Sequence, residues 1–299
     1  MKVRKKYLSS LCAKRDLFNY LFTYTCFFER IFKMKIMVNG ISGFMGREVA
    51  KLCDVGYRGA SLYVGVDPNA KPDFEFKAVK DFSDIENVSE IDCIIDFSHH
   101  TCIPSLLEFA VVNKIPAVIA TTGHTEEELA AITEASKSIP VFFSANMSLG
   151  VALLVELAKN AAVAMPDAEI EIVEKHHNRK IDAPSGTALM IAEAIKEVRP
   201  EAYANCGRSG QGKRCFAEIG IHAIRMGNVV GEHEVILATQ NQTITLKHEA
   251  HSRALFAEGA IAAAAFLVKC GNGLYDMKSL VSGVESEQQF AQNDTMTVL

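Results

Sequence analysis

The sequence lacks the short motifs that mark common metal sites. It has eight cysteines among 299 residues, yet they are scattered, and neither a Cys-x-x-Cys pair nor a His-Glu-x-x-His motif occurs. Several cysteines stand inside apolar runs, where a reduced thiol behaves as a small hydrophobic side chain. The absence of paired cysteines argues against a zinc knuckle, and the scattered thiols predict a reducing, cytoplasmic compartment.

An excess of positive charge is also missing. Lysine and arginine number 31 against 36 acidic residues, which gives a net charge of −5, so a general nucleic-acid-binding face is not expected. The aromatic run at 17–28 is shorter than the roughly 20 residues that cross a bilayer. It is followed by Glu29 and Arg30 instead of a small-residue cleavage site. We expect no membrane span and predict that residues 1–33 form a poorly ordered extension.

From Lys35 onward, short apolar runs alternate with segments compatible with helices. Continuous Val/Ile runs separated by helices are typical of a parallel sheet covered on both faces. This pattern predicts a Rossmann-type α/β domain. The expected strands are 35–40, 61–67, 91–98, 116–123 and 140–146, and the expected helices begin at 45 and cover 101–113 and 125–138.

After Asn146 the pattern changes to that of a second, α+β domain with an open mixed sheet. Residues 168–177 begin with strict polar/apolar alternation, which indicates a strand with one solvated face. The alanine-rich segment 251–270 is expected to be a helix that returns to cover the first domain. Further helices are expected at 148–165 and 185–198, and extended segments at 215–224, 229–239 and 242–248. The predicted domains are 34–147 plus 253–285 for a dinucleotide and 148–252 for substrate and oligomerisation, with a polar tail at 286–299.

The segment VNGISGFMGRE (38–48) joins the first predicted strand to the first helix. Gly40 permits a tight turn, Gly43 allows the backbone to approach a pyrophosphate, and Gly46 allows close helix–sheet packing. The helix start offers unpaired N–H groups to phosphates. Asp67 ends the second strand, where an acid can bind the adenosine ribose. The pattern predicts a dinucleotide site, with a glycine-rich structural turn as the alternative.

Other residues near this loop leave the choice of dinucleotide open. Asp67 repels a ribose phosphate and favours NAD(H), whereas Lys71 nearby could favour NADP(H). Arg47 either contacts phosphate or is simply a solvated helix residue. The turns DFS (96–98) and ATTGHT (120–125) end two further strands. Ligands of open α/β sheets bind at this carboxyl edge, so together the turns outline a crevice.

The segment EKHHNRKIDAPSGTAL (174–189) carries the most informative cluster. A metal pair is one interpretation, but His176 and His177 are adjacent and would point to opposite faces of a strand. Solvated surface histidines are a second. The third, which we favour, is an acid catalyst beside an anion site: a histidine titrates near neutrality, Lys180 is cationic, and Pro184–Thr187 opens a helix. A small dicarboxylate is the implied ligand.

Taken together, VNGxxGxMGR, DFS, the TTG turn, FSANMSLGV, the histidine–DAPSGTA segment and GEHE resemble the 4-hydroxy-tetrahydrodipicolinate reductase family over about residues 35–278. The resemblance implies reduction of 4-hydroxy-tetrahydrodipicolinate in lysine and diaminopimelate biosynthesis, NADH or NADPH as cofactor, and a homotetramer. It implies that His176 donates a proton, assisted by Lys180. The substrate-binding residues that it implies are His177, Ser185, Gly186 and Thr187.

The resemblance also implies a set of residues along the dinucleotide, from the glycine loop, the strand ends and the domain hinge. These are Gly40, Ser42, Gly43, Phe44, Met45, Gly46, Asp67, Phe97, Ser98, Ala120, Thr121, Thr122, Gly123, Ala145, Asn146, Met147 and Arg253. Ser42, Phe44, Pro68 and Ala120 depart from residues common in the family, and with Asp67 they favour NADH slightly. A non-catalytic dinucleotide-binding regulator and another NAD(P)H-dependent small-acid reductase are the alternatives.

Overall fold

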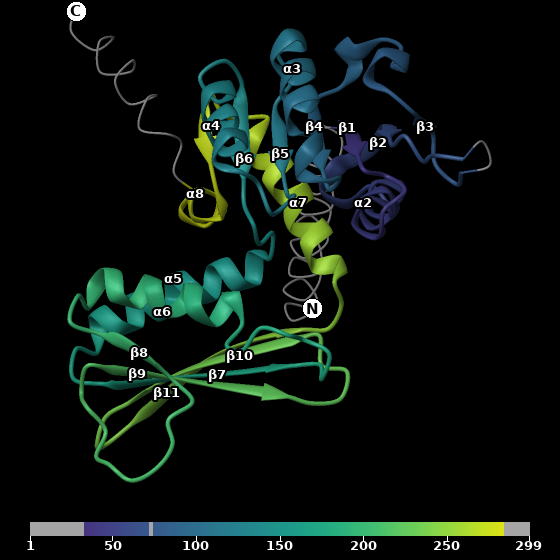
Figure 1. The fold of residues 1–299 in the computed structure, drawn as a ribbon. Helices are drawn as coiled ribbons and strands as arrows, with labels where there is room; N and C mark the ends of the chain where they lie inside the picture. Colours follow the sequence, from purple (N-terminus) through teal and green to yellow (C-terminus); the bar gives the residue numbers. More distant parts are fainter. Residues whose placement is uncertain (1–32, 72–73, 284–299) are drawn as a thin grey trace, which may run out of the picture.

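The structure, a computed structural model, describes residues 33–71 and 74–283. The predictions made for residues 1–32 and for the tail 286–299 lie outside the described residues. Two bodies, each built on one sheet, lie one above the other in Figure 1. The chain crosses between them after β6 and returns through α7.

The first body is a seven-stranded sheet in the order β12-β6-β5-β4-β1-β2-β3, and all of its strand pairs are parallel. This confirms the predicted Rossmann-like fold. The strands are β1 (Met34–Asn39), β2 (Ala60–Val66), β3 (Ala78–Val79), β4 (Cys93–Asp96), β5 (Ala117–Ile119), β6 (Pro140–Phe143) and β12 (Gly273–Tyr275). The helices are α2 (Phe44–Asp54), α3 (Ile103–Asn113), α4 (Glu126–Ala135), α7 (Ala254–Leu267) and α8 (Met277–Ser282).

Two apolar layers cover the two faces of this sheet. Because side chains alternate along a strand, Ile36 and Val38 of β1 pack toward α2 and α7, whereas Met37 packs toward α3 and α4. The helix expected at 251–270 is α7, and its alanines pack in the first of these layers. The sheet is therefore buried on both sides, as its Val/Ile runs indicate.

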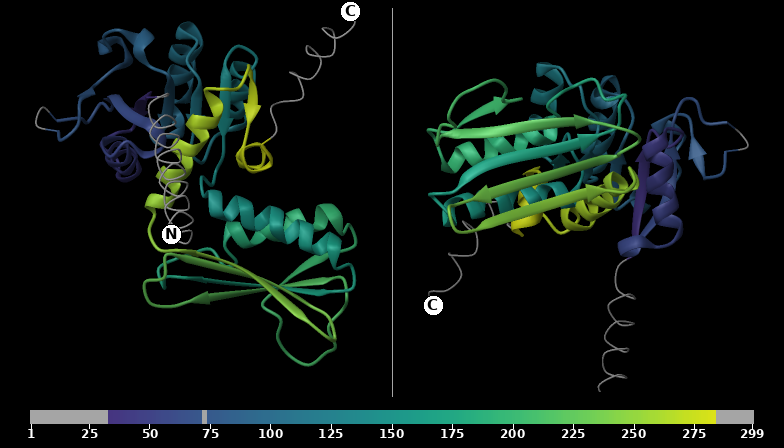
Figure 2. Two further views of the ribbon diagram at one scale, coloured as in Figure 1. Left: turned by 180° about the vertical axis from the view of Figure 1, so that it is seen from behind. Right: turned by 90° about the horizontal axis from the view of Figure 1, so that it is seen from below.

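The second body is a five-stranded mixed sheet in the order β11-β10-β7-β9-β8. β7 pairs parallel to β9 and antiparallel to β10. Its helices α5 (Leu149–Ala164) and α6 (Gly186–Val198) pack on one face, and the other face is open (Figure 2, right). The strands are β7 (Glu169–His176), β8 (Tyr203–Cys206), β9 (Glu218–Arg225), β10 (Gly231–Ala238) and β11 (Thr243–Ala250).

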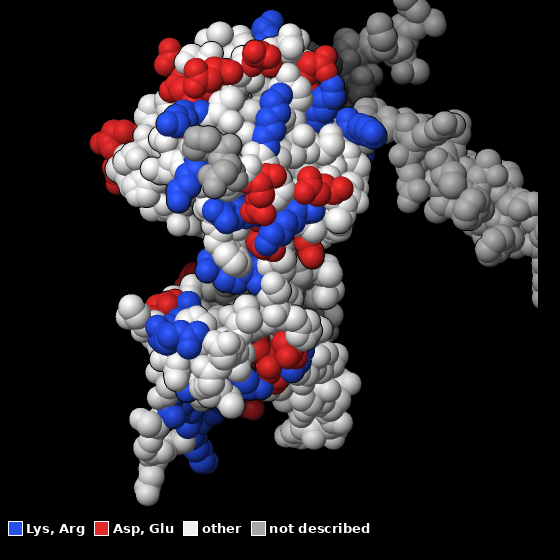
Figure 3. Space-filling model, turned by 90° about the vertical axis from the view of Figure 1, so that its right-hand side faces the viewer, with Lys and Arg blue, Asp and Glu red and all other residues white. Residues whose placement is uncertain are grey.

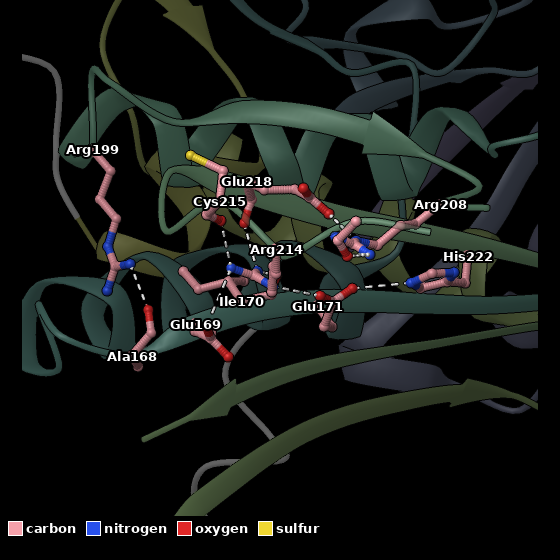
Figure 4. Close-up of polar contacts among 11 residues, drawn as sticks. Ala168, Glu169, Ile170, Glu171, Arg199, Arg208, Arg214, Cys215, Glu218 and His222 are labelled. Atoms are coloured by element: carbon pink, nitrogen blue, oxygen red, sulfur yellow. Dashed lines mark hydrogen bonds and ion pairs between the residues drawn. The ribbon is translucent and has the colours of Figure 1, made fainter. Parts of the chain in front are cut away.

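The alternation predicted for 168–177 decides which side chains of β7 face the helices. Ile170, Ile172, Glu174 and His176 are buried, and the residues between them are more exposed. On the open face Glu171 accepts a hydrogen bond from Arg214 and pairs with His222 (Figure 4). The strand thus presents polar groups to both faces of the sheet.

Several short elements are not predicted by the sequence. β3, β8 and β12 have two to four residues and α8 has six, too few for a period of 2 or 3.6 to be recognised. In the first body, the strands predicted to end at 40, 67, 98, 123 and 146 extend past the observed ones because they include residues of the following turn. Those residues, at the carboxyl ends of β1, β4, β5 and β6, form the edge where the candidate site lies.

Candidate active site

The glycine loop leaves the start of α2 without a side-chain cap. Gly40 has a φ of +80°, and a Cβ atom there would lie 2.7 Å from the Cα of Ser98. A Cβ atom on Gly46 would lie 2.2 Å from the carbonyl oxygen of Gly40. Gly43 is the N-cap and provides no side-chain hydrogen bond. The tight turn and the close packing therefore require glycine, and the first N–H groups of α2 are open to an anion.

Asp67 holds the glycine loop from the end of β2. Its carboxylate accepts hydrogen bonds from the N–H of Ser42 at 3.1 Å and from the N–H of Asn69 at 2.8 Å. The hydroxyl of Ser42 is buried and has no hydrogen-bond partner among the described residues. The loop thus combines a fixed negative charge with an unused hydroxyl and free backbone donors. This set suits the ribose and pyrophosphate of a dinucleotide.

Arg47 lies at the edge of the same loop. Its Nε donates to the carbonyl oxygen of Ser42 at 3.1 Å, and its guanidinium lies 5.2 Å from the centre of the Phe74 ring. Glu75 approaches it to 3.8 Å. The side chain is therefore engaged in local contacts that neutralise part of its charge.

A buried carboxylate, Asp96, joins the ends of β1, β4 and β5. It accepts hydrogen bonds from Asn39 at 2.8 Å, from the Ser98 hydroxyl at 2.6 Å and from the Thr121 hydroxyl at 2.9 Å. Burial raises its pKa, although these donors oppose the rise. Sequence reasoning selected Ser98 and Thr121 but missed Asp96 and Asn39. The signal was present, because both missed residues are the last residues of parallel strands.

The other predicted residues at this edge of the sheet differ in exposure and in backbone conformation. Gly123 has a φ of +83°, so the turn after β5 requires glycine. Ala120 is buried, whereas Thr122 is exposed. Phe97 and Met45 are partly buried against the core.

The linker after β6 connects the two bodies. The side-chain amide of Asn146 donates to the Thr187 hydroxyl at 3.3 Å, and Met147 is buried against α7, where a Cβ atom on Gly259 would lie 1.7 Å from its carbonyl oxygen. The neighbouring residue Ala145 is exposed. Figure 3 shows that the molecule narrows between the bodies and that Lys or Arg side chains lie beside the narrowing. Residues 144–147 therefore contact both halves of the candidate site.

Arg253 is the N-cap of α7 at the second crossing between the bodies. Its guanidinium lies 5.3 Å from the centre of the Phe44 ring, which is half-exposed at the start of α2. The structure thus places this predicted hinge residue against the helix that follows the glycine loop.

In the second body, His176 ends β7 on the face covered by helices. Its Nδ1 lies 2.6 Å from Oε2 of Glu174. Glu174 is fully buried and accepts two hydrogen bonds of 2.7 Å from the guanidinium of Arg225. Burial lowers the pKa of His176, and the Glu174 carboxylate opposes that decrease. Sequence analysis did not select Arg225, and it included Glu174 only as the first residue of the segment 174–189.

The anion site was predicted at the start of α6. Ser185 caps the helix, its hydroxyl accepting from the N–H of Ala188 at 3.2 Å, and its own N–H donates to Glu174 at 3.0 Å. A Cβ atom on Gly186 would meet nothing within 4 Å. The backbone N–H of Gly186 interacts with the exposed carboxylate of Asp182, so the open space beside Gly186 is one where a carboxylate is already accommodated.

Lys180 and His177 precede the start of α6 in the chain and contact each other through their backbones. The Nζ of Lys180 lies 2.8 Å from the carboxylate of Asp182, and its N–H donates to the carbonyl oxygen of His177. The Nδ1 of His177 is buried without a hydrogen-bond partner among the described residues. Because Asp182 is exposed, a buried dicarboxylate can replace it as the partner of Lys180.

His233, on β10, was missed as a site residue although its GEHE motif was noted. Its Nε2 lies 3.1 Å from the Ser185 hydroxyl, and its ring centre is 5.2 Å from that of His176. Burial, and then the neighbouring His176, lowers its pKa to about 4. It is a neutral residue between His176 and the helix cap.

The described residues contain no group of three or more His, Cys, Asp or Glu side chains that could hold a metal ion. Within the described ranges, no helix is long and apolar enough to cross a membrane.

A Rossmann-like sheet with an uncapped glycine-loop helix, facing a histidine–carboxylate site on a second sheet, defines the class of NAD(P)H-dependent oxidoreductases. The chain belongs to the dihydrodipicolinate reductase family, since residues 34–147 match the model of the N-terminal part and residues 150–281 that of the C-terminal part.

Curated relatives agree with this assignment, and a solved structure shares the fold. The chain is 48% identical over 252 residues to the 4-hydroxy-tetrahydrodipicolinate reductase of Caldanaerobacter subterraneus subsp. tengcongensis, covering 83% of this chain and 98% of the relative. It is 42% identical to the reductase of Clostridium tetani, covering 83% and 97%. The dipicolinate-bound dihydrodipicolinate reductase from Paenisporosarcina sp. TG-14 has the same fold, with a TM-score of 0.70 at 23% identity, covering 82% of this chain and 98% of that one.

Proposed function

We propose that this protein reduces 4-hydroxy-tetrahydrodipicolinate to tetrahydrodipicolinate with loss of water, in diaminopimelate and lysine biosynthesis. One observation carries the proposal: the buried carboxylate of Glu174 contacts both the ring of His176 and the N–H of Ser185. A proton donor and an anion seat are thereby joined in one rigid unit. Such a unit suits a ring that carries carboxylates and must accept a proton.

The substrate residues act by charge and alignment. Lys180, His177 and the start of α6, with Ser185, Gly186 and Thr187, hold the two carboxylates. Loss of water leaves a conjugated cyclic imine, which takes up one hydride and one proton to give the product. When bound, the reduced nicotinamide supplies that hydride. His176 delivers the proton, and Lys180 stabilises the negative charge of the bound dianion.

Protonation of His176 is expected to be linked to substrate binding. Burial lowers its pKa in the structure described here, so the neutral ring is favoured near pH 7. Two carboxylates brought close to the ring favour its charged form and raise its pKa. The protonated form of His176 is therefore favoured when the substrate is bound.

The residues at the first sheet fit a dinucleotide, and we infer a preference for NADH. The uncapped start of α2 and the unpartnered Ser42 hydroxyl can hold the pyrophosphate. The Asp67 carboxylate, fixed by two N–H groups, would repel a 2′-phosphate. Replacing Asp67 by serine should raise the ratio of kcat/KM for NADPH to that for NADH by about tenfold. An unchanged ratio would contradict the inference.

We also propose that the protein is a cytoplasmic homotetramer. The open face of the second sheet carries the half-buried apolar side chains of Val173 and Ile236 and the exposed Ile224, between ion pairs of Lys175 and Glu232. Such a surface suits contact with a second copy. Light scattering that gives a monomer mass at micromolar concentration would contradict this.

Steady-state kinetics test the activity. Freshly generated substrate should be turned over with NADH or NADPH by the natural protein. The His176→Gln protein should keep its dinucleotide affinity and lose turnover. Dinucleotide binding without turnover in the natural protein would instead favour a non-catalytic regulator.

A further inference from the structure

Glu174 is the point at which three parts of the second body meet. Its carboxylate receives Nδ1 of His176 at 2.6 Å, both terminal nitrogens of Arg225 at 2.7 Å and the N–H of Ser185 at 3.0 Å. These partners come from β7 itself, from β9 and from the start of α6. Each carboxylate oxygen therefore accepts two hydrogen bonds, and the carboxylate has one fixed orientation.

We propose that Glu174 and Arg225 are positioning residues, which act through His176 by fixing the ring nitrogen that carries the transferred proton and by tying it to the carboxylate seat. The proposal rests on the proposed role of His176 as proton donor. Neither residue is expected to touch the substrate.

The contact of Glu174 determines the tautomer of His176. An ionised carboxylate can only accept, so the ring must donate its Nδ1–H to Glu174. Nε2 is then the nitrogen that gains and loses the proton. It faces Gly231, where a Cβ atom would lie only 3.2 Å away, and the missing side chain leaves that nitrogen room.

Arg225 keeps the carboxylate ionised and also holds the loop that bears Lys180. Burial alone would raise the pKa of Glu174, but the hydrogen bonds from Arg225 and His176 keep it below its ordinary value. The same guanidinium donates to the carbonyl oxygen of Asp182 at 2.6 Å. One side chain thereby fixes the base partner of His176 and the path of the substrate loop.

The charges around His176 predict that the loss of Glu174 and the loss of Arg225 change its pKa in opposite directions. Its ring interacts with Glu174 on its own strand, Arg225 on β9, His233 on β10 and Lys180 in the loop. Of these, Glu174 favours the protonated ring, whereas Arg225 and Lys180 oppose it. Removing Glu174 should lower the pKa of His176, and removing Arg225 should raise it.

The test measures ring protonation and turnover separately in the full-length protein. Nitrogen-15 NMR of histidine-labelled protein, with His176→Gln assigning the signal, should show the Nδ1–H tautomer in the natural protein. Glu174→Gln should lower the pKa of His176 by about one unit or more and Arg225→Gln should raise it.

Turnover should fall about 10²-fold in Glu174→Gln, with KM changing less than kcat. The fall of turnover at alkaline pH should move to lower pH in Glu174→Gln and to higher pH in Arg225→Gln.

Glu171→Gln is the matched control, since Glu171 lies on the same strand with its own arginine and histidine. It should leave the tautomer and the pH profile unchanged. An Nε2–H tautomer in the natural protein, or pKa changes of the same sign in both variants, would overturn the proposal. If Glu174→Gln does not fold, the tautomer and Arg225→Gln still decide it. If the pKa of His176 changes as predicted but turnover does not change, His176 is not the proton donor. The positioning by Glu174 and Arg225 would then have no effect on catalysis.

Discussion

Strand β7 carries two clusters of the same composition, one on each face. Glu174, Arg225 and His176 lie beneath α5 and α6, where the Glu174 side chain is 0% exposed. On the open face the Glu171 side chain is 29% exposed and meets Arg214 at 2.9 Å and His222 at 3.0 Å. Hydrogen-bond lengths barely distinguish them. Their surroundings do, because charge interactions strengthen as water is removed.

The two clusters also differ in what lies behind them. The buried one contacts the start of α6, the loop of Lys180 and the neutral His233, whereas Arg214 donates to backbone oxygens of Ile170 and Glu218. The first therefore joins groups that can bind a ligand, and the second fastens strands and a loop of the sheet. On the proposed function, similar residues serve chemistry in one place and structure in the other.

The largest expected difference concerns turnover. His176→Gln should reduce kcat by about 10²- to 10⁴-fold, which is the usual contribution of a general acid. His222→Gln should change kcat less than twofold, because its ring lies on the other face of the sheet. Comparing kcat for both variants under saturating substrate measures this. Equal losses would mean that the face of the sheet does not separate the functions.

Stability should differ next. Glu174→Ala leaves the Arg225 charge without its partner, which should cost about 3–5 kcal/mol in the free energy of unfolding. Glu171→Ala should cost about 1 kcal/mol or less, since its pair is partly solvated. Urea unfolding at one pH gives both numbers. A larger cost for Glu171→Ala would indicate that contact with a second copy covers its pair on the open face.

The buried cluster should also make stability depend on pH. The pKa of His233 is about 4 in the folded protein, below its value of about 6.5 in an unfolded chain. The unfolded state therefore binds the proton first, so stability is complete above pH 6.5 and declines as the pH falls toward 4. The loss attributable to His233 should approach roughly 3 kcal/mol. Urea unfolding across this range should show a flatter dependence in His233→Gln, and an identical slope would argue against a buried neutral ring.

The smallest effect concerns the glycine beside each cluster. Gly231→Ala places a methyl group 3.2 Å from Nε2 of His176 and should lower kcat/KM several-fold, by about 1 kcal/mol. Gly220→Ala would displace the flexible end of Glu171 and should leave kcat/KM unchanged. Kinetics of the two alanine variants should separate them, and equal values would indicate that Nε2 has room to move.

Much of the fold follows from local pattern. The Val/Ile runs of β1, β4 and β5 and the alternation of β7 identify their strands, since burial on two faces or on one determines which residues are apolar. β3 and β12 escape prediction because they contain two and three residues and exist only by pairing with longer strands. Their positions depend on tertiary contacts, which a short window of sequence does not contain.

The candidate site divides in the same way. His176, Lys180 and Ser185 lie within ten positions, so chain spacing alone brings them together. Arg225 and His233 lie on β9 and β10 and reach the site only because these strands flank β7. The periodicity of the sequence does not reveal the strand order of a mixed sheet. These two side chains can therefore be recognised as site residues only once the strand order is known.

The hydrogen bond from Asn146 to Thr187 has a thermodynamic consequence for the two ligands. It joins the linker between the bodies to the carboxylate seat, so an anion that engages Thr187 changes the restraint on the linker. Dinucleotide and dicarboxylate should therefore bind cooperatively, each changing the affinity of the other by the same factor. Asn146→Ala should reduce that factor toward one while leaving each ligand able to bind alone.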